Sequence, residues 1–270
     1  MTKLFVTDLD GTLLSKDHKI SSRNREALQM LVDSGYEIAF CSGRILSSVK
    51  SLAEPLGFVD FHIANNGAVV SYKNEIIYEK ALDYSKLRKI VDLAYENDKN
   101  YHMYDKDTYY SDLYKPNRLV HMKRDDGDGY HVKVRCHPDI LSDIIQEKIS
   151  IYKITLHMSF INEPEIFNKV SELENLAVYM SGAWSSDIME AGISKGNAIK
   201  QIELNLDKKY DKIVAIGDHQ NDIDMVQYAD VGIAMGNAID ELKEVSDYIT
   251  DSNEDDGFYK AVKYILEGEK

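Results

Sequence analysis

The sequence predicts an α/β protein, in which a doubly wound parallel sheet forms the core and an α+β domain is inserted into it. Two observations lead to this prediction. Apolar strand patterns alternate with helical patterns over residues 1–81 and again over residues 188–270, an order that favours a parallel sheet with right-handed crossovers. Residues 82–187 between them are rich in tyrosine and have an α+β pattern. We therefore expect a discontinuous core domain and an inserted domain at 82–187.

The first core segment contains strands, helices and a hairpin. Ser21 or Ser22 can cap the first helix, Gly35 follows its end, and Asn74 can turn the chain back between two extended stretches. Asn65-Asn66-Gly67 forms a turn of its own before the hairpin. The expected strands are 4–6, 36–41, 61–64, 68–72 and 76–79, and the expected helices are 20–34 and 45–56.

The inserted domain and the second core segment are expected to contain further helices and strands. Within the insert we expect helices at 140–151 and 163–173, strands at 153–160 and 176–180, and an exposed loop at 125–129. In the resumed core we expect helices at 194–204, 221–228, 238–245 and 257–266, and strands at 212–216, 231–235 and 248–250.

Composition restricts the function classes. The 270 residues are 44% hydrophobic and 29% charged, as in a soluble globular protein, and no apolar run approaches the length of a membrane span. The net charge of −14 argues against nonspecific nucleic-acid binding, which needs a positive surface. The N-terminus lacks the pattern of a signal peptide, and Cys41 and Cys136 are far apart in sequence. A reducing, cytoplasmic location is the simplest interpretation, and the sequence gives no oligomeric state.

Two carboxylates follow the first strand. Asp8 and Asp10 are two residues apart, so in an extended chain their side chains point to the same side. Gly11 then permits a sharp turn. Carboxylates held close together repel each other unless a cation or a shared proton relieves them, and Mg²⁺ prefers oxygen ligands. Taken alone, this stretch is equally compatible with a strand that ends in an ordinary Asp-Gly turn.

Four polar segments are expected to meet at one edge of the sheet. In an open parallel sheet, ligands bind beyond the carboxyl ends of the strands. The segments at 8–12, 42–44 and 217–222 follow strands, and the segment at 192–197 begins a helix. Together they supply carboxylates, a hydroxyl, a lysine and glycine-flanked backbone amides, which are the groups that phosphoryl transfer needs.

These segments resemble the motifs of the haloacid dehalogenase superfamily of phosphatases. Asp8-Leu9-Asp10-Gly11-Thr12 resembles the first motif, Ser42 the second and Lys195 the third. Gly217-Asp218 with Asn221-Asp222 resembles the fourth, and all four occur in the family's order. The insert lies between the second and third motifs, as in members with an α/β cap, often called Cof-type or class IIB. The resemblance implies a Rossmann-like core.

The resemblance also implies roles for the carboxylates. Asp8 would be the nucleophile that forms an aspartyl-phosphate. Asp10 would protonate the leaving oxygen and later accept a proton from water, so its pKa should be raised while Asp8, bound to the metal, stays ionised. Mg²⁺ would be held by Asp8, the backbone carbonyl of Asp10, and Asp218. Asp222 would support this site, directly or through water.

Donors to the phosphoryl group come from the remaining motif positions. The resemblance assigns this role to the Ser42 hydroxyl, the backbone amides of Leu9 and Gly43, and Lys195. Asn221 would either contact the phosphate or fix Lys195. Arg44 and His219 lie close to motif positions, and we assign neither of them a role.

The predicted function is that of a Mg²⁺-dependent phosphatase of small phosphorylated metabolites, such as sugar phosphates or nucleotide-type cofactors. The inserted domain would act as a lid that determines specificity. A phosphomutase of the same superfamily and a catalytically idle ligand-binding protein on this fold are the alternatives. The presence of both Asp8 and Asp10 argues against the idle protein.

Overall fold

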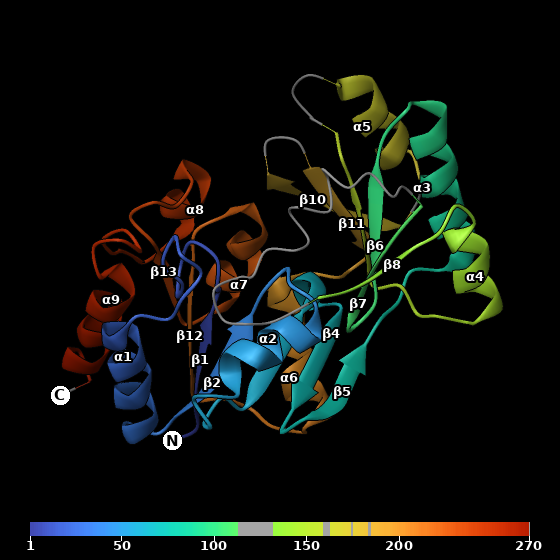
Figure 1. The fold of residues 1–270 in the computed structure, drawn as a ribbon. Coiled ribbons are helices and arrows are strands. Elements are labelled where there is room, and N and C mark those ends of the chain that lie inside the picture. The colour runs from blue at the N-terminus through green and yellow to red at the C-terminus, as the bar shows by residue number, and fades with distance from the viewer. Residues whose placement is uncertain (113–131, 159–162, 174, 183–184, 270) are drawn as a thin grey trace. The chain divides into compact units, whose positions relative to one another are not determined.

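The computed structural model of the chain describes residues 1–112, 132–158, 163–173, 175–182 and 185–269. These residues form two compact units (Figure 1). Unit 1 contains residues 1–78 together with 194–269, and unit 2 contains residues 79–112 and the described part of 132–193. The loop predicted at 125–129 lies outside the described residues. Within the described part of the chain, no helix is both long enough and apolar enough to cross a membrane.

Unit 1 is built on an eight-stranded sheet. In sheet order its strands are β14 (Tyr248–Ile249), β13 (Val231–Ala234), β12 (Lys212–Gly217), β1 (Lys3–Thr7), β2 (Tyr36–Cys41), β3 (Phe61–Ala64), β4 (Val69–Tyr72) and β5 (Glu75–Glu79). The strands from β14 to β3 are parallel, and β4 pairs antiparallel with β3. This arrangement confirms the predicted α/β core, because the strands from β14 to β3 pair in parallel and the antiparallel pairing begins only after the Asn65–Gly67 turn.

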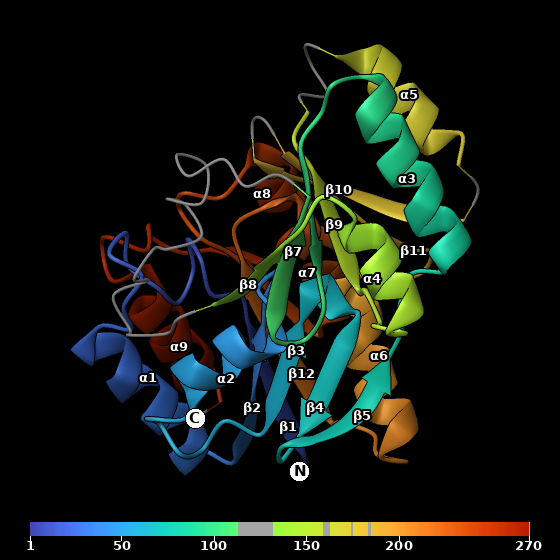
Figure 2. The same ribbon diagram turned by 45° about the vertical axis from the view of Figure 1, so that its right-hand side comes forward.

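The helices of unit 1 bury the sheet. They are α1 (Ser22–Asp33), α2 (Leu46–Ala53), α6 (Lys195–Asn205), α7 (Ile223–Tyr228), α8 (Asp240–Val245) and α9 (Gly257–Glu267). Helices α1 and α9 lie side by side, and α6 contacts α7 (Figures 1 and 2). Leu4, Phe5 and Val6 are consecutive in β1 and all fully buried, so both faces of the central strand are covered.

Two helices end three or more residues before the limit that the sequence predicted. Helix α2 ends at Ala53 rather than at residue 56 because Pro55 has no backbone N–H with which to continue the helical hydrogen bonds, although Glu54 still has helical backbone angles. Helix α4 of unit 2 (Ile140–Gln146) ends before the predicted residue 151, and Lys148 has a left-handed φ of 56° that a helix does not accommodate.

Unit 2 consists of a six-stranded sheet with helices on one face. In sheet order the strands are β10 (Leu176–Gly182), β11 (Ser185–Glu190), β9 (Lys153–Leu156), β6 (Tyr101–Tyr104), β7 (Thr108–Ser111) and β8 (Lys133–Cys136). The pairs are antiparallel except for β7 with β8. Helices α3 (Tyr84–Glu96), α4 and α5 (Pro164–Ser171) share one apolar core with the sheet, on the same side of it (Figure 2). This is the predicted α+β pattern.

Strand β11 determines where unit 2 ends. The predicted boundary between residues 187 and 188 would divide this strand. However, β11 pairs with both β10 and β9, and the compact unit extends to Ile193. The sequence analysis missed β11 because its Ser-Ser-Asp start does not resemble an apolar strand.

The opposite face of the unit 2 sheet carries a buried ion pair. Lys153 Nζ lies 2.9 Å from Asp187 Oδ2, and Thr155 Oγ1 donates to Asp187 Oδ1 at 2.6 Å. Lys153 also lies over the ring of Tyr104 at 4.6 Å. Their neighbours along the strands, Ile154 and Leu156 among them, face the helices. The sheet therefore separates an apolar face from a polar one.

Candidate active site

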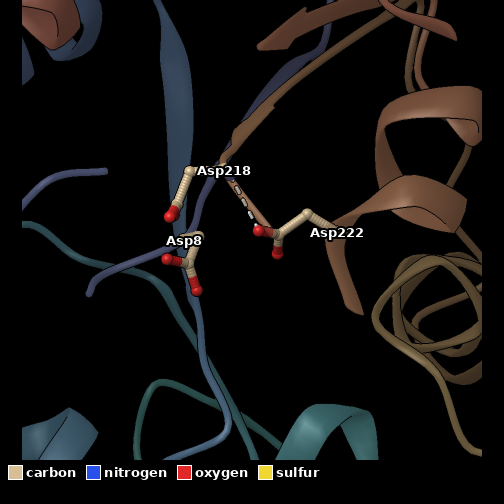
Figure 3. Close-up of side chains that lie close together, drawn as sticks. All are labelled: Asp8, Asp218 and Asp222. Atoms are coloured by element: carbon tan, nitrogen blue, oxygen red, sulfur yellow. Dashed lines mark hydrogen bonds between the residues drawn. The ribbon is translucent and has the colours of Figure 1, made fainter. Parts of the chain in front are cut away.

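Three aspartates from two segments of unit 1 meet beyond the strand ends. Asp8 follows β1 and Asp218 follows β12, and these strands are parallel neighbours, so their carboxyl ends share one edge of the sheet. Asp222 lies in the short 3₁₀ turn Gln220–Asp222 that follows. Each of the three offers an oxygen within 4.8 Å of the others (Figure 3). Of the four residues predicted to hold metal, the structure brings these three side chains together.

The turn after Asp10 fixes Asp218. Gly11 has φ of 84°, and a Cβ built on it would lie 2.4 Å from Asp218 Oδ2, so any larger residue would displace that carboxylate. The Thr12 hydroxyl donates to Asp218 Oδ1 at 2.8 Å. The first motif thus both supplies Asp8 and orients Asp218 from the fourth motif.

Lys195 joins the third motif to this cluster. It is the first residue of α6, whose N-cap Ser194 accepts a hydrogen bond from the Asn197 amide. Its side chain is fully buried, and Nζ donates to Asp8 Oδ1 and to Asp222 Oδ1, each at 2.5 Å. Burial alone would lower the pKa of Lys195, but the two carboxylates raise it well above its usual range, so the ammonium stays charged.

Asp222 acts mainly through its neighbours. Its Oδ1 accepts from Lys195, and its Oδ2 accepts from the backbone amides of Asp218 and His219 at 2.9 Å each. Both oxygens therefore already serve to hold the lysine and the loop. This pattern fits the indirect role among the two that the sequence left open for Asp222.

The cluster carries more negative than positive charge. Three carboxylates surround one ammonium, and burial together with the neighbouring carboxylates raises the pKa of Asp8 and brings that of Asp218 to about 7. A buried set of oxygen ligands with excess negative charge is suited to a hard divalent cation, which would lower both pKa values. The expectation that Asp8 stays ionised concerns the site with Mg²⁺ bound, and it remains a prediction.

Asp10 points to a different set of partners. Arg44 donates to it twice, from Nε to Oδ2 at 2.7 Å and from Nη2 to Oδ1 at 2.6 Å. His18 Nδ1 lies 3.2 Å from Oδ1. Partial desolvation acts to raise the pKa of Asp10, whose side chain is 43% exposed, but the hydrogen bonds and charges of Arg44 and His18 outweigh it and hold the pKa well below its usual range. The predicted raised pKa is wrong here because the sequence analysis gave Arg44 no role.

The predicted phosphate donors lie in neighbouring loops. Ser42 follows β2 and is buried, and its Oγ accepts from the Arg44 amide at 3.2 Å. Leu9 is fully buried at the start of the first turn. Asn221 donates from Nδ2 to Asn66 Oδ1 at 2.9 Å, and not to Lys195 in any hydrogen bond described. A Cβ on Gly43 would also meet Asn66 Oδ1, at 2.9 Å.

Four contributors were missed from the sequence. They are Thr12, which orients Asp218, His18 and Arg44, which hold Asp10, and Asn66, which holds Asn221. Asn66 had a usable signal, because paired asparagines before a glycine favour the left-handed backbone that Asn65 and Asn66 adopt.

Comparison with known proteins connects this geometry to a family. The sequence profile of haloacid dehalogenase-like hydrolases matches residues 5–262. The protein YxeH of Bacillus subtilis, which is named as a phosphatase, is 31% identical over 98% of this chain and 99% of its own length. The 5-amino-6-(5-phospho-D-ribitylamino)uracil phosphatase YwtE of Bacillus subtilis is 30% identical over 99% of both chains.

A solved structure agrees at the level of the fold. A sugar phosphatase of haloacid dehalogenase subclass IIB superimposes with a TM-score of 0.83 over 98% of this chain and 99% of its own, at 22% identity. The family generally uses a divalent metal, and the buried acidic group of unit 1 is consistent with that use. The chain belongs to the haloacid dehalogenase-like hydrolases and is an enzyme of their phosphatase type.

Proposed function

We propose that this protein is a Mg²⁺-dependent phosphatase of small phosphorylated metabolites, either sugar phosphates or nucleotide-type cofactors, that acts through an aspartyl-phosphate on Asp8. The observation that supports this most strongly is the buried contact of Lys195 with Asp8 and Asp222, next to Asp218. It combines a nucleophilic carboxylate, a fixed cation and oxygen ligands in one group. The net charge of −14 favours small substrates over nucleic acid.

The proposed metal ligands are Asp8, Asp218 and the backbone carbonyl of Asp10. Asp222 would hold Lys195 and the Asp218 amide in place rather than bind the cation itself. When bound, Mg²⁺ would neutralise charge on the phosphoryl oxygens and favour the ionised form of Asp8.

The remaining groups would attack phosphorus, bind the phosphoryl oxygens and transfer a proton. Asp8 attacks phosphorus, and the Ser42 hydroxyl, the Leu9 and Gly43 amides and Lys195 bind the phosphoryl oxygens as charge shifts onto them. Asp10 protonates the leaving oxygen. Because Arg44 holds the pKa of Asp10 low, this step requires substrate binding to raise that pKa while Arg44 still orients the carboxyl.

We further propose that unit 2, which spans the predicted insert at 82–187, is the cap that selects the substrate. YwtE, which resembles this chain along its whole length, is named for a phosphate ester on a ribityl chain attached to uracil. That compound combines sugar-like and nucleobase-like parts, which is the range we propose for this chain. A cytoplasmic location fits the two cysteines, both of which are free thiols.

Phosphate release from a panel of phosphorylated metabolites tests the proposal. Wild-type protein should release phosphate with Mg²⁺ and lose this activity in chelator, and Asp8→Asn should be inactive while retaining the wild-type circular dichroism spectrum. Equal turnover by Asp8→Asn would refute the nucleophile, and activity after thorough metal removal would refute the cation. Isomerisation of a sugar phosphate with little phosphate release would indicate a phosphomutase, and binding without turnover an idle protein.

A further inference from the structure

We propose that Asn66 is a positioning residue of the phosphate site, an inference that rests on the proposed function. Asn66 lies in the 3₁₀ turn Asn65–Gly67 between β3 and β4, and no motif of the sequence assigned it a role. Only 2% of its surface is exposed, although it belongs to a loop. A buried carboxamide is costly unless its polar atoms are hydrogen-bonded, so its partners identify its purpose.

The Asn65–Gly67 turn is bonded to two of the loops that carry proposed phosphate donors. Asn66 donates from its backbone amide to the Ser42 carbonyl at 3.0 Å, and Asn65 donates likewise to the Arg44 carbonyl at 2.8 Å. Through its side chain, Asn66 accepts from Asn221 Nδ2 at 2.9 Å. One residue therefore fixes the separation between the Ser42 loop and the Asn221 side chain.

Close packing on both sides adds to these bonds. A Cβ on Gly43 would lie 2.9 Å from Asn66 Oδ1, so the carboxamide lies directly against the Gly43 backbone. On the other side, Gly67 has φ of 99°, and a Cβ there would lie 2.2 Å from the carbonyl oxygen of Ser194. Ser194 caps the helix that begins with Lys195. The turn thus touches three of the four segments from which donors are proposed.

Backbone conformation alone does not explain the asparagine. Asn66 has φ of 55°, a left-handed value that asparagine tolerates and that glycine adopts without strain. Glycine would satisfy the turn but would leave the Asn221 amide without this acceptor. The function of residue 66 therefore depends on its carboxamide, which orients Asn221 and supports Gly43 where they meet the phosphoryl group.

The variant Asn66→Gly separates the contribution of the left-handed backbone from that of the carboxamide. It keeps the left-handed backbone and removes only the side chain, so its melting temperature should stay close to that of wild type. We expect kcat/KM with a substrate of the panel to fall about tenfold, which is the scale of one lost hydrogen bond. Calorimetric titration with inorganic phosphate in Mg²⁺ should show a similar loss of affinity, which a purely structural role would not produce.

Asn74→Gly is the matched control. Asn74 also has a left-handed φ, 72°, but it is exposed in the turn between β4 and β5. The same substitution there should change neither phosphate affinity nor kcat/KM. Asn66→Gly combined with Asn221→Ala should cost little more than Asn221→Ala alone, because both changes break the same bond.

Each result decides a different claim. Wild-type phosphate affinity and kinetics in Asn66→Gly would overturn the inference, and so would full additivity of the double variant. If wild-type protein neither hydrolyses a monoester nor binds phosphate, the proposed function fails and this inference fails with it. Active wild-type protein with an unaffected Asn66→Gly overturns the inference alone.

Discussion

Lys195 is fully buried, and the cost of burying an ammonium must be offset by anionic partners. Asp8 and Asp222 provide that compensation directly. Among the hydrogen bonds described, the third carboxylate, Asp218, has no cationic donor. It accepts a hydrogen bond from the neutral Thr12 hydroxyl. Burial and the nearby Asp222 charge consequently raise the pKa of Asp218 to about 7.

This shift predicts a stability that depends on pH and on metal. The folded protein holds the Asp218 proton more tightly than the unfolded chain, where the pKa is 3.8, so the stabilisation is complete below that value and is lost as pH rises through about 7. In chelator, calorimetry should give a melting temperature several degrees lower at about pH 8 than at about pH 6. Mg²⁺ should restore more stability at the higher pH.

Asp218→Asn serves as the control for that experiment. The amide cannot ionise, so the variant should lose the part of the pH dependence that Asp218 contributes, and most of the Mg²⁺ response. Equal melting temperatures of wild type at both pH values in chelator would contradict the argument.

Arg44 predicts a kinetic effect. Its guanidinium makes two parallel hydrogen bonds to Asp10, a geometry that the single ammonium of lysine does not reproduce. We expect Arg44→Lys to lower kcat on the order of tenfold, because Asp10 loses its fixed orientation, with little change in melting temperature. Arg25→Lys on the exposed side of α1 is the matched control. An unchanged or raised kcat in Arg44→Lys would show that Arg44 does not position the acid.

The central elements were predictable because they are buried on both faces. The observed ranges of β2 and β3 equal the predicted ones, since each is a mostly apolar run, interrupted once by Glu37 or His62, that ends before a polar residue. In unit 2, strand β6 was not predicted, although His102 between the buried Tyr101 and Met103 gives it the alternation of a half-buried strand. Helix α3 did have the apolar spacing of a helix, with Leu87, Ile90, Val91 and Ala94 buried, and was overlooked.

The site also contains some residues whose position was predictable from the sequence and some whose position was not. Asp8, Ser42 and Asp218 lie at strand ends, so the strand prediction also predicted their edge of the sheet. The direction in which Asp10 points was not predictable. It depends on loop conformations such as the left-handed His18, which no spacing of residues encodes.

The ion pair across β9 and β11 gives a test of unit 2. Lys153 and Asp187 are both almost fully buried, so removing one of them takes a close counter-charge away from the other in a buried site. Asp187→Ala should lower the free energy of unfolding by about 3–5 kcal/mol, and Lys153→Met combined with it should recover much of that loss. Denaturant titration measures both. A double variant as unstable as the sum of the two single variants would show that the two charges do not depend on each other.

At the scale of the whole molecule, the two units have separate sheets and separate helices. The acidic cluster and the helix that carries Lys195 belong to unit 1, and the described apolar core of unit 2 contains none of the proposed metal ligands. A ligand stabilises only the structure that must be intact to bind it. If the units open independently, metal should therefore protect one of them and leave the other unchanged.

Hydrogen exchange measured by mass spectrometry can resolve this. Addition of Mg²⁺ should slow amide exchange in β1, β12 and α6 of unit 1, and leave β9, β11 and α3 of unit 2 at their metal-free rates. Asp218→Asn should show no response in either unit, which separates binding at the cluster from general effects of the salt. Equal slowing in both units would mean that they unfold as one cooperative body. In that case metal binding would also stabilise unit 2, the unit proposed to select the substrate.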